Sequence, residues 1–179
     1  MPTFSAIVTA HADELAMRKT VEMLLLQTRR PNEIIVLASD IDTTLARKVY
    51  PYVRFYDEEN KNDWGHDKRA KGLDLATSSY AGWFNHDDSY DKEYIEKMMA
   101  AVSDGSDAAY CGWSGNSAPQ FRASSSTSGN YIVNVKIGRD AGYTDRHYEA
   151  DGTFIDRISS ITKRIKFVEE VLYFHNEVR

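Results

Sequence analysis

Short hydrophobic runs and helical stripes alternate through the first part of the chain. The pattern predicts a strand at 4–9 and a second strand at 33–37, whose uninterrupted apolar run from Ile34 to Leu37 suits burial on both faces of a sheet. Between them, apolar residues recur at i, i+4, i+7 and i+8 from Met17 to Leu25, which predicts a helix that covers a sheet. The chain is therefore expected to begin as strand, helix, strand.

The same alternation continues to residue 102. Further strands are predicted at 53–56 and 80–84, and further helices at 43–49, 67–77 and 94–102. Strands that alternate with helices indicate βαβ crossovers. We therefore expect an α/β fold with a mainly parallel sheet flanked by helices.

The pattern changes after residue 102 and predicts a small mixed C-terminal part. Strands are expected at 108–113, 131–135, 165–167 and 171–174, and a last helix from about residue 151. A Ser/Gly-rich stretch at 114–130 separates the first two of these strands. Long loops in compact domains are more often functional or disordered than merely connective, so we expect a mobile loop with a lid or acceptor-binding role.

Composition limits the possible classes of protein. The 179 residues predict one globular domain, 1–179, and a net charge of −5 gives no electrostatic reason to expect a nucleic-acid partner. Cys111 is the single cysteine, which excludes a disulfide framework and a cysteine-rich zinc site. No apolar run approaches the roughly 20 residues of a membrane span, and no signal peptide is recognised. We expect a cytoplasmic protein, whose oligomeric state the sequence does not indicate.

The run from Tyr80 to Phe84 ends in a polar group of Asn85, His86, Asp87 and Asp88. Ligands of open α/β sheets collect at the carboxyl ends of strands, where this group falls. Hard oxygen ligands suit Mg²⁺ or Mn²⁺, and a divalent ion on a loop commonly neutralises a diphosphate. The alternative is that acidic residues after a strand form turns or helix caps, which is the role expected for Asp91.

Four blocks of the chain, taken in order, resemble family 2 glycosyltransferases of the GT-A fold. The blocks are FSAIVTAH (4–11), QTRRPNEIIVLASD (27–40), HDKRAKGLDLATSSYAGWFNHDD (66–88) and EADGTFIDR (149–157). The resemblance implies a Rossmann-like sheet and the transfer of a sugar from a UDP-sugar, such as UDP-glucose, to an acceptor hydroxyl. The acceptor, a saccharide or another alcohol, is not implied.

The resemblance also implies which residues bind the donor. Arg69 stands where the family's "ARN" arginine contacts the diphosphate, although a solvated helix face is the competing interpretation. The usual "DDGS" after the second strand is replaced by Ala38 to Ile41, which leaves Asp40 as the candidate for the base. The expected donor-binding residues are Thr9, Ala10, His11, Asp40, Arg69, Asn85, His86 and Asp88.

The metal is expected to be Mn²⁺ or Mg²⁺. Because the family's first DxD acid aligns with Asn85, metal binding falls chiefly on Asp87, with Asp88 beside it as a ligand or as an orienting residue. His175 is the third candidate ligand, since members of this fold often bring a late histidine to the metal. The alternative for His175 is a surface or packed histidine.

The chemistry needs a base beside the acceptor. In an inverting transfer a carboxylate takes the proton of the attacking hydroxyl. Asp151 aligns with the second acid of the family's "ED" motif, whereas Ala150 replaces the first and Glu149 is displaced by one position. Both acids could instead interact with the dipole at the start of a helix.

The resemblance divides the domain into a nucleotide-sugar-binding half, 1–102, and an acceptor and catalytic half, 103–179. Two other functions remain open. A non-catalytic sugar-nucleotide-binding protein is the stronger rival, because Ala38, Asn85 and Ala150 each replace an expected acid. A metal-dependent phosphodiesterase is the weaker one, since it usually needs more metal ligands.

Overall fold

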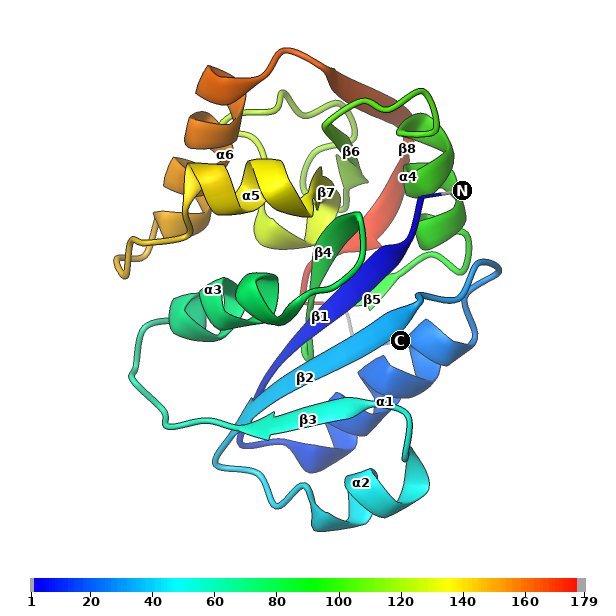
Figure 1. Cartoon of the computed structure of the whole chain (residues 1–179), viewed down its shortest axis with the longest axis vertical. Helices are drawn as coiled ribbons and strands as arrows, with labels where there is room; N and C mark the ends of the chain where they lie inside the picture. The colour runs from blue at the N-terminus through cyan, green and yellow to red at the C-terminus, as the bar shows by residue number, and fades with distance from the viewer. Residues whose placement is uncertain (1, 177–179) are drawn as a thin grey trace.

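A computed structural model describes residues 2–176 and contains one eight-stranded sheet with helices on both faces (Figure 1). The strands are β1 (Phe4–His11), β2 (Glu33–Ser39), β3 (Arg54–Asp57), β4 (Tyr80–Asn85), β5 (Ser89–Tyr90), β6 (Ala108–Trp113), β7 (Tyr131–Asn134) and β8 (Ile165–Phe174). The helices are α1 (Glu14–Leu25), α2 (Thr44–Val49), α3 (His66–Leu75), α4 (Tyr94–Ala101), α5 (Val135–Ala141) and α6 (Ala150–Ile161), with a 3₁₀ turn at Ser128–Asn130.

The strand order is β3-β2-β1-β4-β7-β6-β8-β5. β1 lies between β2 and β4 and is parallel to both, and β3 is parallel to β2. β7 pairs antiparallel with β4 and β6, whereas β8 is parallel to β6 and antiparallel to β5. The expected α/β fold with a mainly parallel sheet and a small mixed C-terminal part is therefore confirmed.

Two hydrophobic layers cover the sheet. One contains Met17, Val21 and Leu24 of α1 together with the buried face of α4. The other contains the buried faces of α3, α5 and α6, which lie together on the left in Figure 1. Alternate residues of β1 enter different layers, so both faces of this strand are buried, which explains its predominantly apolar sequence.

Helix α3 sits unusually close to the sheet, and its start is well capped. The carboxylate of Asp63 accepts from the backbone N–H groups of Gly65 (3.0 Å) and Asp67 (2.6 Å). A side chain at Gly72 would place a Cβ 2.3 Å from Ile7 of β1, so only glycine permits this approach. These two features bring the first turn of α3 to the carboxyl ends of β1 and β4.

Three elements differ from the sequence-based expectation. β8 is one strand and not two, and it bends through register shifts against β6 on either side of Gly112. The exposed Glu169 and Glu170 interrupt its hydrophobic pattern, which is why the sequence suggested two segments. α5 and β5 were not predicted, because a seven-residue helix and a two-residue strand carry little periodicity.

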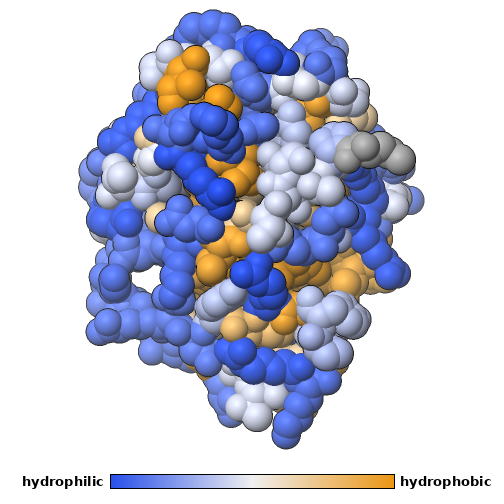
Figure 2. All heavy atoms as spheres, in the orientation of Figure 1, coloured by the Kyte–Doolittle hydropathy of each residue, from blue (hydrophilic) through white to orange (hydrophobic). Residues whose placement is uncertain are grey.

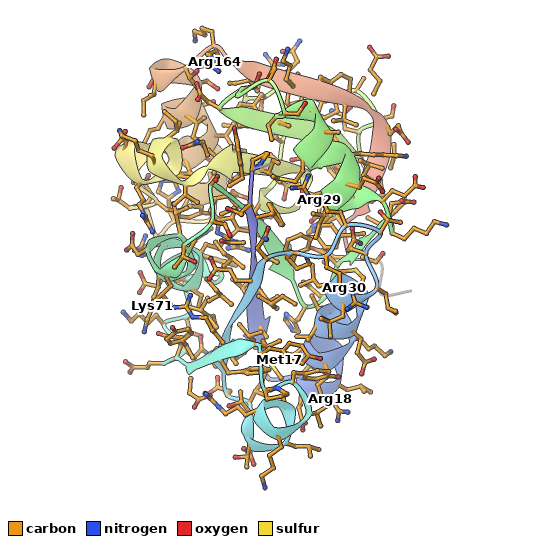
Figure 3. All side chains as sticks on the ribbon, turned by 45° about the vertical axis from the view of Figure 1, so that its right-hand side comes forward. Met17, Arg18, Arg29, Arg30, Lys71 and Arg164 are labelled. Carbon is orange, nitrogen blue, oxygen red and sulfur yellow. The ribbon has the colours of Figure 1, made fainter. Side chains whose placement is uncertain are left out.

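On the face shown in Figure 2, hydrophobic side chains form separate patches among hydrophilic ones. Of the residues labelled in Figure 3, Arg18 lies on α1, Arg29 and Arg30 in the segment after it, Lys71 on α3 and Arg164 just before β8, whereas Met17 belongs to the buried core. Within residues 2–176, none of the helices is long and apolar enough to cross a membrane.

Candidate active site

The carboxyl ends of β1 and β4 form the centre of the site. Thr9 and Asn85 are direct partners in the β1–β4 register, and the Thr9 hydroxyl donates to Asn85 Oδ1 (2.9 Å). Arg69, on the first turns of α3, donates to the same oxygen through Nη2 (2.8 Å) and to the backbone carbonyl of Trp64 through Nη1 (2.8 Å). Arg69 is buried, so its alternative interpretation as a residue on a solvated helix face is wrong.

Asp88 is the hub of a buried polar cluster. Its carboxylate is 0% exposed and accepts four hydrogen bonds, two at each oxygen. Oδ2 accepts from Asn85 Nδ2 and from the Tyr173 hydroxyl, both at 2.8 Å. Oδ1 accepts from His175 Nδ1 (3.0 Å) and from the backbone N–H of Asn176 (2.8 Å). Burial, followed by the negative charge of Asp88, raises the pKa of the Tyr173 phenol, so the phenol keeps its proton and donates it in the hydrogen bond.

The Asp88 carboxylate orients His175. With the Nδ1 proton directed to Asp88, the Nε2 atom is left as an acceptor, and it lies 3.3 Å from Asn176 Nδ2. A carboxylate behind an imidazole is the usual arrangement that fixes the tautomer of a metal-binding histidine. Both oxygens of Asp88 already accept hydrogen bonds from the protein. Asp88 is therefore better suited to orient His175 than to bind an ion directly.

Asp87 has the opposite environment to its neighbour, because it is exposed and lines a cavity together with His175. Within residues 2–176, however, no three His, Cys, Asp or Glu side chains are grouped closely enough to hold a metal ion. The expected set of Asp87, Asp88 and His175 is thus not assembled as three free ligands. Asp87 and His175 fit an ion that takes its remaining ligands from a bound diphosphate and water.

This first cavity has a volume of about 480 Å³, which is typical of small-ligand sites. It contains most of the residues expected to bind a donor. Its lining residues are Thr9, Ala10, His11, Asn60, Asn62, Trp64, Gly65, Lys68, Arg69, Asn85, His86, Asp87 and His175.

Asp40 and Asp88 are the two expected donor-binding residues that do not line this cavity. Asp40 contacts two residues that do: its Oδ2 lies 3.3 Å from His11 Nδ1 and accepts a hydrogen bond from Asn60 Nδ2 (3.1 Å). Its backbone lies in the left-handed region, with φ of 57°. The side chain therefore braces the rim of the cavity.

Lys68 is a cavity residue that the sequence analysis missed. Its ammonium group is buried and donates to the Ser39 hydroxyl, which also lies 3.2 Å from His11 Nδ1. Burial lowers the pKa of Lys68, and the carboxylates of Asp63 and Asp40 oppose this effect. The sequence offered one signal for Lys68, which is its position next to Arg69 in the third block. Two adjacent residues at the start of a helix can both reach the ends of the neighbouring strands.

A second cavity of 420 Å³ adjoins the first and shares Trp64, Arg69, Asn85 and His175 with it. Asp151, half-buried in the first turn of α6, and the exposed Glu149 line this second cavity only. Neither acid caps the helix in the usual way, since Asp151 Oδ1 accepts only from the next N–H and Glu149 forms no side-chain cap bond.

The Ser/Gly-rich segment 114–130 forms another wall of the second cavity. Several hydrogen bonds tie it to the body of the protein. Among them, Trp113 Nε1 donates to the carbonyl of Ser125 (3.3 Å), the N–H of Ala123 donates to Asp156 of α6 (3.0 Å), and the Tyr94 hydroxyl donates to the carbonyl of Gly129 (3.0 Å). Its role as a lid or acceptor-binding loop stays a prediction.

Comparison with known proteins identifies the family. Residues 5–163 match the sequence model described as Glycosyl transferase family 2. The chain belongs to this family. A comparison with curated protein sequences gave no significant match.

Solved structures of this glycosyltransferase type share the fold. S. aureus TarS 1-349 in complex with UDP has a TM-score of 0.77 at 18% identity, over 96% of this chain and 60% of that one. Glucosyl-3-phosphoglycerate synthase from Mycobacterium tuberculosis, with Mn²⁺, UDP and glucosyl-3-phosphoglycerate, has a TM-score of 0.72 at 14% identity, over 99% of this chain and 73% of that one. Mannosyltransferase PcManGT from Pyrobaculum calidifontis, in complex with GDP-Man and Mn²⁺, has a TM-score of 0.76 at 13% identity, over 99% of this chain and 58% of that one.

The match to a longer TarS chain, with a TM-score of 0.75 at 19% identity, covers 97% of this chain and 36% of TarS. This chain therefore spans about a third of that protein. The likenesses establish the GT-A fold, and the expectation from the four sequence blocks is confirmed at the level of family and fold.

Proposed function

We propose that the chain is a metal-dependent, inverting glycosyltransferase domain that moves a sugar from a UDP-sugar, such as UDP-glucose, to an acceptor hydroxyl. The observation that carries this proposal is the junction of the two cavities at Arg69, Asn85 and His175. A donor in the first cavity would present its sugar to the second, where the two candidate base residues lie. Residues 1–102 would then supply most of the donor site, and residues 103–179 the base.

The donor would lie along the carboxyl ends of the parallel strands. Thr9, Ala10 and His11 are in position to line the nucleoside, as in the family to which the chain belongs. Arg69 and Lys68 offer two cations for the diphosphate, and a guanidinium suits paired phosphate oxygens. The structures of TarS with UDP and of the mycobacterial synthase with UDP and Mn²⁺ support the choice of nucleotide and ion.

Asp87 and His175 would hold Mn²⁺ or Mg²⁺, and Asp88 would orient His175 through Nδ1. A divalent ion held there stabilises the negative charge that develops on the departing diphosphate. Carboxylate and imidazole are both acceptable ligands for Mn²⁺.

Asp151 is proposed as the general base. It lies in the cavity that adjoins the donor site, and its carboxylate accepts a hydrogen bond at Oδ1 from the N–H of Gly152, the next residue. Glu149 lines the same cavity and is the second candidate. Asp151→Asn should lower transfer by roughly 10²- to 10⁴-fold, the range that general-base catalysis supplies, and should leave UDP affinity unchanged.

The donor and metal assignments can be tested by thermal unfolding with UDP, GDP, CDP and dTDP, each with Mn²⁺ or with EDTA. Saturation at about 100 times the dissociation constant stabilises the fold by about 2.7 kcal/mol. We expect this stabilisation for UDP with Mn²⁺ and its loss with EDTA. Equal stabilisation in EDTA would contradict the metal assignment, and no response to any nucleotide would contradict the proposed function.

The second candidate function is sugar-nucleotide binding without transfer. Asn85 replaces the family's first DxD acid, and its amide already makes three hydrogen bonds, with Thr9, Arg69 and Asp88. The two functions predict equal UDP binding and differ only in turnover. Release of UDP from UDP-glucose in the presence of Mn²⁺, slow in water and faster with an acceptor, would establish the transferase.

A further inference from the structure

Two large aromatic side chains are exposed side by side at the second cavity. Trp64 is 60% exposed and Tyr148 is 73% exposed, and their rings meet edge to face with centroids 5.7 Å apart. Both rings line this cavity, which also holds Asp151. Aromatic rings of this size normally bury their faces, so an exposed pair beside a catalytic cavity offers an apolar platform to a ligand.

The platform is held in place by the start of α3. Trp64 has a φ of 55°, a left-handed conformation that is strained for a bulky side chain. Its carbonyl accepts from Arg69 Nη1 (2.8 Å), and the adjacent Gly65 N–H is held by Asp63. Strain of this kind persists only where surrounding contacts maintain it, and it concentrates at functional sites.

Tyr148 is fixed from the opposite side. The preceding Arg146 pairs with Asp67 of α3 and donates to the carbonyl of Tyr143 (3.0 Å). The segment that carries Tyr148 is therefore attached to the same helix start as Trp64. The two rings form one preorganised surface, although they are far apart in the sequence.

The rest of the cavity is mainly polar. The serines of 124–128 line one wall, and Glu149 and Asp151 line another. Among the described residues that line this cavity there is no lysine, and its arginine, Arg69, and the exposed His175 are those assigned above to the donor diphosphate and its ion. Hydroxyls and carboxylates suit a ligand that carries many hydroxyl groups, whereas an anionic ligand would meet the two carboxylates.

We propose that the acceptor is a neutral saccharide, one ring of which packs against the exposed aromatic pair of Trp64 and Tyr148 and directs a hydroxyl to Asp151. This inference rests on the proposed function and adds the class of acceptor to it. The C–H face of a sugar ring is apolar, while its rim carries the hydroxyls that the serines and carboxylates of the cavity would bind. A phosphorylated polyol lacks the ring and carries the wrong charge.

The test is direct binding, measured by calorimetry and tryptophan fluorescence with UDP and Mn²⁺ present. The probes are oligosaccharides of glucose, mannose, galactose and N-acetylglucosamine, compared with glycerol 3-phosphate and ribitol 5-phosphate. Tyr148 is the residue to vary, because Trp64 also lines the donor cavity. Tyr148→Ala should weaken binding of the preferred oligosaccharide by about tenfold or more, and Tyr148→Phe, which keeps the ring, should bind like the wild type.

Tyr52→Ala is the matched control, since Tyr52 is 69% exposed and lines neither cavity. It should bind saccharide and UDP as the wild type does. The inference is overturned if no oligosaccharide binds, if a phosphorylated polyol binds more tightly, or if Tyr148→Ala binds as tightly as the wild type. UDP affinity, measured on the same variants, tests the proposed function separately, because failure of UDP binding would leave the saccharide measurement intact.

Discussion

Replacing Asp88 by alanine should destabilise the protein more than replacing either of the nearby aspartates, Asp87 and Asp91. Its buried carboxylate accepts from Asn85, Tyr173, His175 and Asn176. The exposed His175 and Asn176 can turn to water, and the Tyr173 hydroxyl keeps a second partner in His175 Nδ1 (2.8 Å), whereas the half-buried amide of Asn85 loses its acceptor. A buried donor left without a partner costs about 1–3 kcal/mol, so we expect Asp88→Ala to lower the free energy of unfolding by about 1–3 kcal/mol.

Urea unfolding followed by tryptophan fluorescence and circular dichroism measures this loss, and two nearby aspartates provide controls. Asp87 is exposed, so Asp87→Ala should change the free energy of unfolding by less than about 0.5 kcal/mol. Asp91 accepts from the N–H of Glu93 (2.8 Å) in the turn before α4, as expected of a turn or cap residue, and Asp91→Ala should cost about 1 kcal/mol.

The three variants also differ in ligand binding. Asp87→Ala should abolish the Mn²⁺-dependent stabilisation by UDP, while Asp91→Ala should keep it. The reasoning would be refuted if Asp88→Ala were as stable as the wild type and Asp87→Ala were strongly destabilised. In that case the exposed aspartate would hold the loop together, and Asp88 would be free to bind the ion.

Three further predictions concern the core. Gly72→Ala should cost about 1–3 kcal/mol, because the new Cβ would lie 2.3 Å from Ile7, and a normal urea midpoint would contradict the close helix packing. Burial raises the pKa of the Cys111 thiol to about 12, so a disulfide reagent should label it only after unfolding; rapid native labelling would show that it is accessible. Burial, followed by the positive charge of Arg69, lowers the pKa of His66 in the folded protein. As the pH falls, this histidine is therefore protonated in the unfolded chain before it is protonated in the folded one. The free energy of unfolding should therefore fall as the pH drops below about 6.5, and this fall should shrink in His66→Gln.

The central elements could be predicted because their hydrophobic periods are unambiguous. β6 was predicted with the bounds that the structure shows, and β1, β2 and α3 within two residues at each end. β8 was divided in two because exposed glutamates interrupt its pattern at a bulge, where neighbouring side chains no longer alternate between the two faces.

The site was predictable as a group of residues and not as a set of contacts. The adjacent Asp87 and Asp88 look equivalent in sequence, yet one is exposed and the other is enclosed by Tyr173, which lies 85 residues further along the chain. That difference arises from the pairing of β5 with β8, which no local pattern encodes. Trp64 and Lys68 were missed for the same reason, because their places depend on the close approach of α3 to the sheet.

The position of β8 between β6 and β5 sets the order in which the site can form during synthesis. Residues up to about 100 contain everything needed for the parallel pairings of β1, β2, β3 and β4. The Asp88 cluster needs residues 173–176, so it can close only when nearly the whole described chain has been made. Nucleotide binding should therefore report folding through β8, because a nascent chain that has formed its first four strands still lacks the support of the segment that carries Asp87 and Asp88.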